Sequence, residues 1–180
     1  WLGDDELQRL HEADAAIAHC PTSNFFLGSG VFNIARAKHA DRPVRVGLGT
    51  DIGAGTSFSI LQTLNEAYKA SQLNRHPLSA AHAYYLATRG SAAAMHLEDK
   101  VGSIAPGMEA DLVVLDMRST PLIAFRMDEA RDFSEQLFVQ MILGDDRAVQ
   151  ATYVASGRFA FTIAGNDREV GPGDSFVIPS

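Results

Sequence analysis

Residues 44–51, Val-Arg-Val-Gly-Leu-Gly-Thr-Asp, decide how this chain is expected to fold. The stretch has the composition of a short buried strand, and Asp51 follows directly after the strand ends. Gly53 and Gly55 come next, and an amphipathic helix is expected over residues 57–73. A (β/α) barrel carries its catalytic groups at the C-terminal ends of its strands. Asp51 is therefore a candidate for metal binding or proton transfer, and capping of the following helix is the alternative use of the same side chain.

A second short apolar strand is predicted over residues 15–19, and polar side chains follow its end as well. The candidates there are His19, Ser23 and Asn24. A crossover of about residues 28–40 separates the two strands, which predicts a right-handed βαβ unit with parallel strands. Parallel strands end at the same edge, so these side chains should lie near Asp51. The alternatives are a packed or supporting imidazole for His19, and turn or cap hydrogen bonds for Ser23 and Asn24.

The second half of the chain changes from helix signals to strand signals. Short strands are predicted at residues 111–116 and 150–155, with a helix over 133–143 between them. Residues 159–180 alternate apolar and polar side chains around Gly165-Asn166-Asp167, which predicts a hairpin within a β-meander.

Composition limits the classes of partner. The formal net charge is -7 and the sequence pI is about 5.2, which disfavours a nucleic-acid-binding face. No apolar run in the sequence is long enough for a membrane span. Cys20 is the only cysteine, so an internal disulfide is excluded and a reducing compartment is compatible. We therefore expect a cytoplasmic, soluble enzyme with no nucleic-acid or membrane partner.

Five motifs in sequence order carry a resemblance to a known family. They are His19-Cys-Pro-Thr-Ser-Asn24, Gly47-Leu-Gly-Thr-Asp51-Ile-Gly-Ala-Gly-Thr-Ser57, Tyr84-Tyr-Leu-Ala-Thr88, Gly102-Ser-Ile-Ala-Pro-Gly-Met-Glu-Ala-Asp-Leu-Val-Val-Leu115 and Leu143-Gly-Asp-Asp-Arg147. Together they resemble the later strands of the metal-dependent amidohydrolases, and more narrowly the guanine deaminase family, over about residues 1–158. The tail at 159–180 weakly resembles a segment of a cupin.

The resemblance implies a zinc-dependent hydrolysis of guanine to xanthine and ammonia, a step of purine catabolism. Members of this family hold one zinc with three histidines and one aspartate, and Asp51 matches the aspartate. It would bind the metal and help to accept the proton of the attacking water. The resemblance assigns His19, Ser23 and Asn24 to substrate binding or to support of the ligands. It also implies a small-molecule purine as substrate and a homodimer for the complete enzyme.

The sequence departs from the family pattern at the other ligands. No His-x-His pair occurs, and neither the general-acid glutamate nor the remaining zinc histidines have counterparts. The histidines outside the first strand fall on expected helix surfaces or loops without metal-ligand spacing: His11, His39, His76, His82 and His96. One carboxylate does not hold a catalytic zinc, so this chain alone is expected to be inactive.

The predicted fold class is α/β, the C-terminal part of a (β/α)8 TIM-type barrel with strands of a small β-sandwich. Residues 1–100 are assigned to the barrel, 101–158 to the closing helix and sandwich strands, and 159–180 to a β-meander tail. Three alternatives for function stay open. They are a non-catalytic module that binds a small ligand, an orphan piece without function, and a deaminase of the same superfamily acting on another aminopurine or a pyrimidine.

Overall fold

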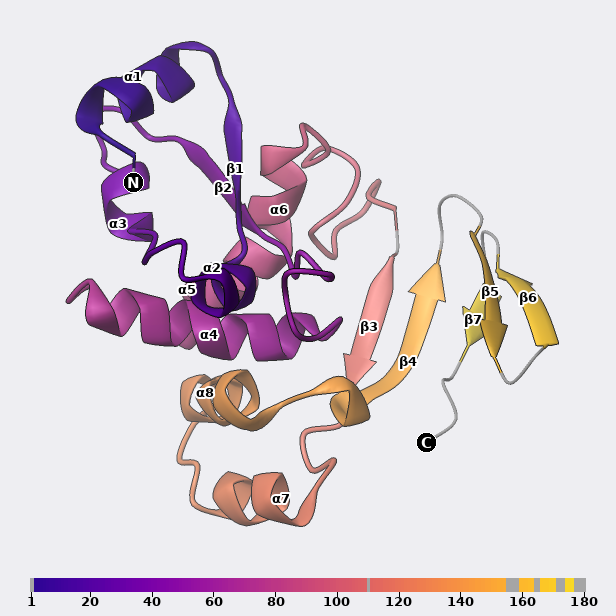
Figure 1. The fold of residues 1–180 in the computed structure, drawn as a ribbon. Helices are drawn as coiled ribbons and strands as arrows, with labels where there is room; N and C mark the ends of the chain where they lie inside the picture. Colours follow the sequence, from indigo (N-terminus) through magenta and orange to yellow (C-terminus); the bar gives the residue numbers. More distant parts are fainter. Residues whose placement is uncertain (1, 110, 155–158, 164–165, 171–173, 177–180) are drawn as a thin grey trace.

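The computed structural model describes residues 2–109, 111–154, 159–163, 166–170 and 174–176 (Figure 1). The first half contains α1 (Asp4–Glu12), β1 (Ala16–His19), α2 (Pro21–Leu27), α3 (Ile34–Ala37), β2 (Arg45–Leu48), α4 (Ile60–Leu73), α5 (Ala80–Ala87) and α6 (Arg89–Ala94). The second half contains β3 (Leu112–Leu115), α7 (Pro121–Asp128), α8 (Phe133–Leu143), a 3-10 helix (Asp146–Ala148), β4 (Val149–Val154), β5 (Phe159–Ile163), β6 (Asn166–Val170) and β7 (Asp174–Phe176).

The strands β1 and β2 pair in parallel, as the sequence predicts. Ala16 lies opposite Arg45 and His19 lies opposite Leu48. Both strands therefore end at the same edge, where the Gly49 amide donates to the carbonyl of His19 at 3.1 Å. Within the described ranges these two strands form a sheet of their own rather than a closed barrel. The described residues of the predicted barrel portion therefore form a mixed α/β arrangement with one βαβ unit, and this arrangement is not a closed barrel.

The crossover between the strands differs from the helix-sized segment expected at about residues 28–40. Two short helices replace it, and the first, α2, already begins at Pro21. Proline fixes a backbone angle that suits the first helical turn and has no amide hydrogen to leave unpaired there. Gly28 then ends α2 in the left-handed conformation (φ 67°), and Asn33 caps α3 by accepting from the Arg36 amide at 2.9 Å. Gly28 therefore ends α2.

The helix α6 packs closely against β2 because a glycine faces it. A Cβ on Gly47 would lie 2.8 Å from Ser91 Cα, so only glycine allows this approach. The Ser91 hydroxyl accepts from the Leu48 amide at 3.1 Å and donates to the Leu86 carbonyl at 2.8 Å. The helices α4, α5 and α8 complete the main core, in which Leu64, Leu86 and Met141 have no exposed surface.

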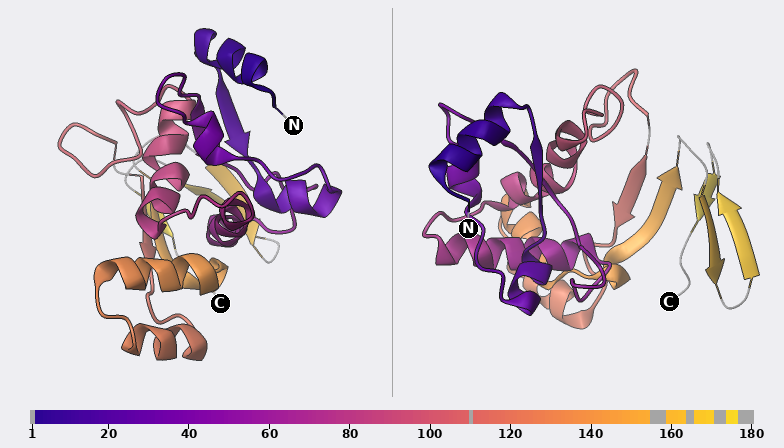
Figure 2. Two further views of the ribbon diagram at one scale, coloured as in Figure 1. Left: turned by 90° about the vertical axis from the view of Figure 1, so that its left-hand side faces the viewer. Right: turned by 45° about the horizontal axis from the view of Figure 1, so that its top comes forward.

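The second half forms a separate sheet and a helical hairpin, as Figure 2 shows from two further sides. The strands β3 and β4 lie where strands are predicted at residues 111–116 and 150–155, and they pair antiparallel with an irregularity between Val114 and Leu115. The helix α8 lies where it is predicted, whereas α7 is not predicted. The two helices share a small core of Ile123, Met127 and Val139.

The tail contains the expected antiparallel hairpin, β5 with β6. The strand β7 instead joins β4, with Thr152 opposite Phe176, so the tail shares a sheet with the preceding region. Residues 171–173, which connect β6 to β7 in the sequence, lie outside the described residues, as does Gly165 of the predicted hairpin turn. Among the described helices, none is long and apolar enough to cross a membrane.

Candidate functional site

Asp51 lies in the loop that follows β2, in an uncommon backbone conformation. Its φ is +48°, a left-handed value that a residue with a side chain rarely adopts. Its carbonyl accepts the amides of Ala54 at 3.2 Å and Gly55 at 2.5 Å, which closes a tight loop. A Cβ at Gly55 would lie 1.9 Å from the Thr50 carbonyl oxygen, so this loop requires glycine at that position.

The loop geometry decides between the two uses of Asp51 that the sequence left open. The cap of α4 is Ser59, whose hydroxyl oxygen accepts from the Gln62 amide at 3.4 Å. Capping of α4 is therefore not the role of Asp51. Its carboxylate is exposed at the C-terminal end of β2, where a barrel carries its reacting groups.

His19 ends β1 as a buried side chain. It is 2 % exposed, its ring lies 5.0 Å from the ring of Phe32, and neither ring nitrogen has a hydrogen-bond partner in the structure. Burial lowers the pKa of His19 to about 4, so the imidazole is neutral at neutral pH. It holds one donor and one acceptor in an apolar setting.

Cys20 and Asp51 lie close together at the two neighbouring strand ends. The Cys20 sulfur is 3.2 Å from the point where a Gly49 Cβ would lie. Burial, and then the negative charge of Asp51, raise the pKa of the Cys20 thiol. A protonated thiol is a poor nucleophile, which argues against a cysteine-based reaction here.

Ser23 and Asn24 lie on α2, so they follow β1 in a helix rather than a turn. Ser23 is 3 % exposed and packs inside the protein. The Asn24 carbonyl accepts from the Ser29 amide at 2.9 Å at the end of α2, and its side chain lines a cavity. The two neighbouring residues thus have different surroundings: Ser23 is buried, and Asn24 lines a cavity.

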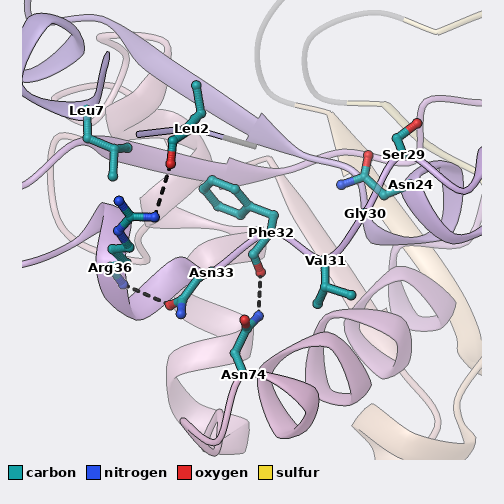
Figure 3. A pocket seen from close by; sticks show the side chains of 10 residues that line it. All are labelled: Leu2, Leu7, Asn24, Ser29, Gly30, Val31, Phe32, Asn33, Arg36 and Asn74. Atoms are coloured by element: carbon teal, nitrogen blue, oxygen red, sulfur yellow. Dashed lines mark hydrogen bonds between the residues drawn. The ribbon is translucent and has the colours of Figure 1, made fainter. Parts of the chain in front are cut away.

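That cavity has a volume of about 220 Å³ and is shown in Figure 3. Its polar wall consists of Asn24, Ser29, Asn33, Arg36 and Asn74, and Leu2, Leu7, Val31 and Phe32 supply the apolar part. Asn74 Nδ2 donates to the Phe32 carbonyl at 2.9 Å, and Arg36 Nη1 donates to the Leu2 carbonyl at 3.1 Å. The sequence does not predict this cavity. The one local feature that points to it is the run Gly28-Ser29-Gly30, of which Ser29 and Gly30 line the cavity.

A catalytic zinc normally takes three protein ligands and keeps one position open. Within the part of the chain that the structure describes, no three His, Cys, Asp or Glu side chains lie together so that they could hold a metal ion. Asp51 offers one carboxylate, and His19 is enclosed by protein. The residues present therefore do not fit a catalytic zinc by themselves.

His11 and His96 make their contacts away from the end of the strand pair that carries Asp51. His11 Nδ1 lies 2.8 Å from the Pro43 carbonyl oxygen, and His96 Nδ1 lies 2.8 Å from Arg45 Nη1. Both contacts are at the opposite end of the strand pair, because Pro43 and Arg45 lie at the start of β2. The structure thus brings Asp51, Cys20 and His19 to one edge.

Curated proteins and solved structures with similar sequences match most of the chain. Guanine deaminase of Escherichia coli (strain K12) is 51% identical over 160 residues, which cover 89% of this chain and 36% of that protein. The solved structure of E. coli guanine deaminase superposes with a TM-score of 0.83 at 51% identity, over 86% of this chain and 36% of that one. A zinc-bound adenosine deaminase from Xanthomonas campestris has a TM-score of 0.70 at 27% identity, over 85% and 34%.

The matched part is thus about a third of the length of these relatives. The model of the amidohydrolase family matches residues 1–158 of the chain. The motifs and the parallel strand pair agree with this match. The chain belongs to the amidohydrolase family.

Proposed function

We propose that the chain serves the zinc-dependent hydrolytic deamination of guanine to xanthine and ammonia, as the C-terminal portion of such an enzyme. The observation that carries the proposal is the exposed Asp51 carboxylate at the C-terminal end of β2, next to the end of β1. The 51% identity to a guanine deaminase supports the choice of guanine.

In this proposal Asp51 contributes one oxygen ligand and the other ligands come from polypeptide outside the described residues. The left-handed backbone at Asp51 and the tight loop that ends at Gly55 fix where the carboxylate leaves the strand. His19 and Ser23 support the strand edge from inside, and Asn24 contacts the purine or the residues around it. We assign no chemical step to these residues alone, since they do not complete a metal site.

The proposal includes a small-molecule purine as the substrate, a homodimer for the complete enzyme and the cytoplasm as its location. The acidic charge of -7 supports the absence of a nucleic-acid partner.

The test is guanine turnover by the purified chain with added zinc, compared with its Asp51→Ala variant. The chain alone is expected to be inactive. It is then mixed with the separately produced remainder of E. coli guanine deaminase, and xanthine is measured by absorbance. Turnover is expected in the mixture and is expected to disappear with Asp51→Ala, because the carboxylate ligand is then missing.

Ser57→Ala is the matched control, since it changes a polar residue further along the same loop and leaves the carboxylate in place. Activity of the chain alone that Asp51→Ala abolishes would refute the expectation of an incomplete site. Activity of the mixture that survives Asp51→Ala would refute the role of Asp51.

A further inference from the structure

A second cavity, of about 310 Å³, lies at the end of the strand pair opposite to Asp51. Its walls come from the C-terminal end of α1, the end of α3, the start of β2, and α5 and α6. Val44, which precedes β2, and Val46 of β2 belong to its lining but are each 1 % exposed, so the accessible apolar surface comes from Ala15, Pro43 and Ala93. Its polar side chains are His11, Asp14, Lys38, Arg45 and Tyr85.

The one carboxylate in this lining is already neutralised. Arg45 Nε lies 3.0 Å from Asp14 Oδ1, and Arg45 Nη2 donates to Asp14 Oδ2 at 3.1 Å. Arg45 Nη1 donates to the Ala93 carbonyl at 3.0 Å, so both ends of the guanidinium are held. Glu98 Oε1 also lies 3.9 Å from Arg45 Nη1, so Arg45 is shared by two carboxylates, of which Asp14 lines the cavity and Glu98 does not.

Lys38 is left as the uncompensated charge. Among the residues that the structure describes, no carboxylate forms an ion pair with it, and the nearest acid along the chain, Asp41, lies 3.6 Å from His39. The side chain is half-buried, and this burial lowers the pKa of Lys38. Burial, and then the charge of Lys38, lower the pKa of His82 on α5, and Tyr85 of the same helix lines the cavity. A partly desolvated cation without a counter-charge favours an anion beside it.

We propose that this cavity binds a small carboxylate with an apolar body, whose carboxylate pairs with Lys38 while its body lies against Ala15, Pro43 and Ala93. The Tyr85 hydroxyl is a second hydrogen-bond donor for the same group. The site is independent of Asp51 and of the deaminase proposal.

The test is a titration of the whole chain with benzoate, followed by the amide signals of Tyr85, Gly90 and Ala93 in 1H–15N NMR. Benzyl alcohol serves as the uncharged ring, and inorganic phosphate as the compact anion. Saturable shifts at the three amides with benzoate, absent with benzyl alcohol, are expected. Lys38→Gln is expected to weaken benzoate binding about tenfold, because a charge-assisted hydrogen bond is lost.

Lys100→Gln removes the same charge at an exposed loop position and is expected to leave benzoate binding unchanged. Equal benzoate affinity for Lys38→Gln and the unchanged chain would overturn the proposal, as would shifts outside the cavity. Phosphate binding that is as tight as benzoate binding, or tighter, would refute the contribution of the apolar body to affinity. If the carboxylate came instead from a second copy of the chain, Lys38→Gln would lower the mass measured by light scattering, and this result would also refute a small-molecule site.

Discussion

At residue scale, His19 combines a buried imidazole with two unpartnered ring nitrogens. Its pKa of about 4 lies below the ordinary value of 6.5, so the unfolded chain binds a proton more readily than the folded chain does. The stabilisation that follows is complete above pH 6.5 and is lost as the pH falls from 6.5 towards 4. The free energy of unfolding is expected to fall by about 2 kcal/mol between pH 7 and pH 5 through this group.

Urea unfolding of the chain and of His19→Gln at both pH values measures this effect. The glutamine does not titrate, so its variant is expected to lack this part of the pH dependence. Asp4 and Asp145 have lowered pKa values and lose their contributions at lower pH, mainly below 3.8. The same pH dependence in both proteins would contradict the assignment to His19.

Gly55 is the second residue whose environment allows a definite expectation. A methyl group there would collide with the Thr50 carbonyl, which lies 1.9 Å from the Cβ position. Gly55→Ala is expected to reduce the free energy of unfolding by about 2 kcal/mol and to shift the Asp51 amide signal. Gly3→Ala is the control, because its Cβ would meet Glu6 at an ordinary 3.6 Å. Equal losses of stability in the two variants would show that the Asp51 loop has room to adjust.

At the scale of elements, α8 depends on a hydrogen-bonded N-cap in the loop that follows α7. Asp132 Oδ1 accepts from the Glu135 amide at 2.9 Å, and Glu135 Oε2 accepts from the Arg131 amide at 2.8 Å. Asp132→Ala is expected to cost about 1 kcal/mol of stability in urea unfolding, whereas Asp132→Ser keeps an acceptor and is expected to cost only a few tenths. Equal losses for alanine and serine would mean that the charge of Asp132 matters more than its hydrogen bond.

The elements also show where local sequence signals were sufficient and where they were not. The end of β1 and α8 followed from apolar patterns and from caps encoded within a few residues. The crossover did not follow from local signals. Its polar residues indicate a turn, whereas Pro21 begins and Gly28 ends a helix there. The helix α7 escaped prediction as well, because it is short and leaves Leu122 and Phe125 exposed, so it lacks a clear apolar face.

At the scale of the whole molecule, large apolar side chains are exposed on several elements. Phe58 is 81 % exposed, Ile104 89 % and Phe125 65 %. Such surfaces favour association, so sedimentation velocity is expected to show species heavier than the monomer as the concentration rises. Replacing Phe58 and Phe125 together with Gln is expected to reduce association, whereas Lys100→Gln places the same residue without removing apolar surface. A monodisperse monomer at every concentration would contradict this expectation.

The sequence by itself determined the strand pair, its parallel direction and the position of Asp51 at the strand end. These features depend on apolar runs, on glycine and proline positions and on motifs that are contiguous in the chain. Only the tertiary structure decided that Ser59 and not Asp51 caps α4, that His19 is buried and that Ser23 and Asn24 face different surroundings. It alone formed the cavity next to Lys38, since its walls come from elements far apart in the sequence. Burial and charge pairing are set by such distant contacts, and local patterns do not encode them.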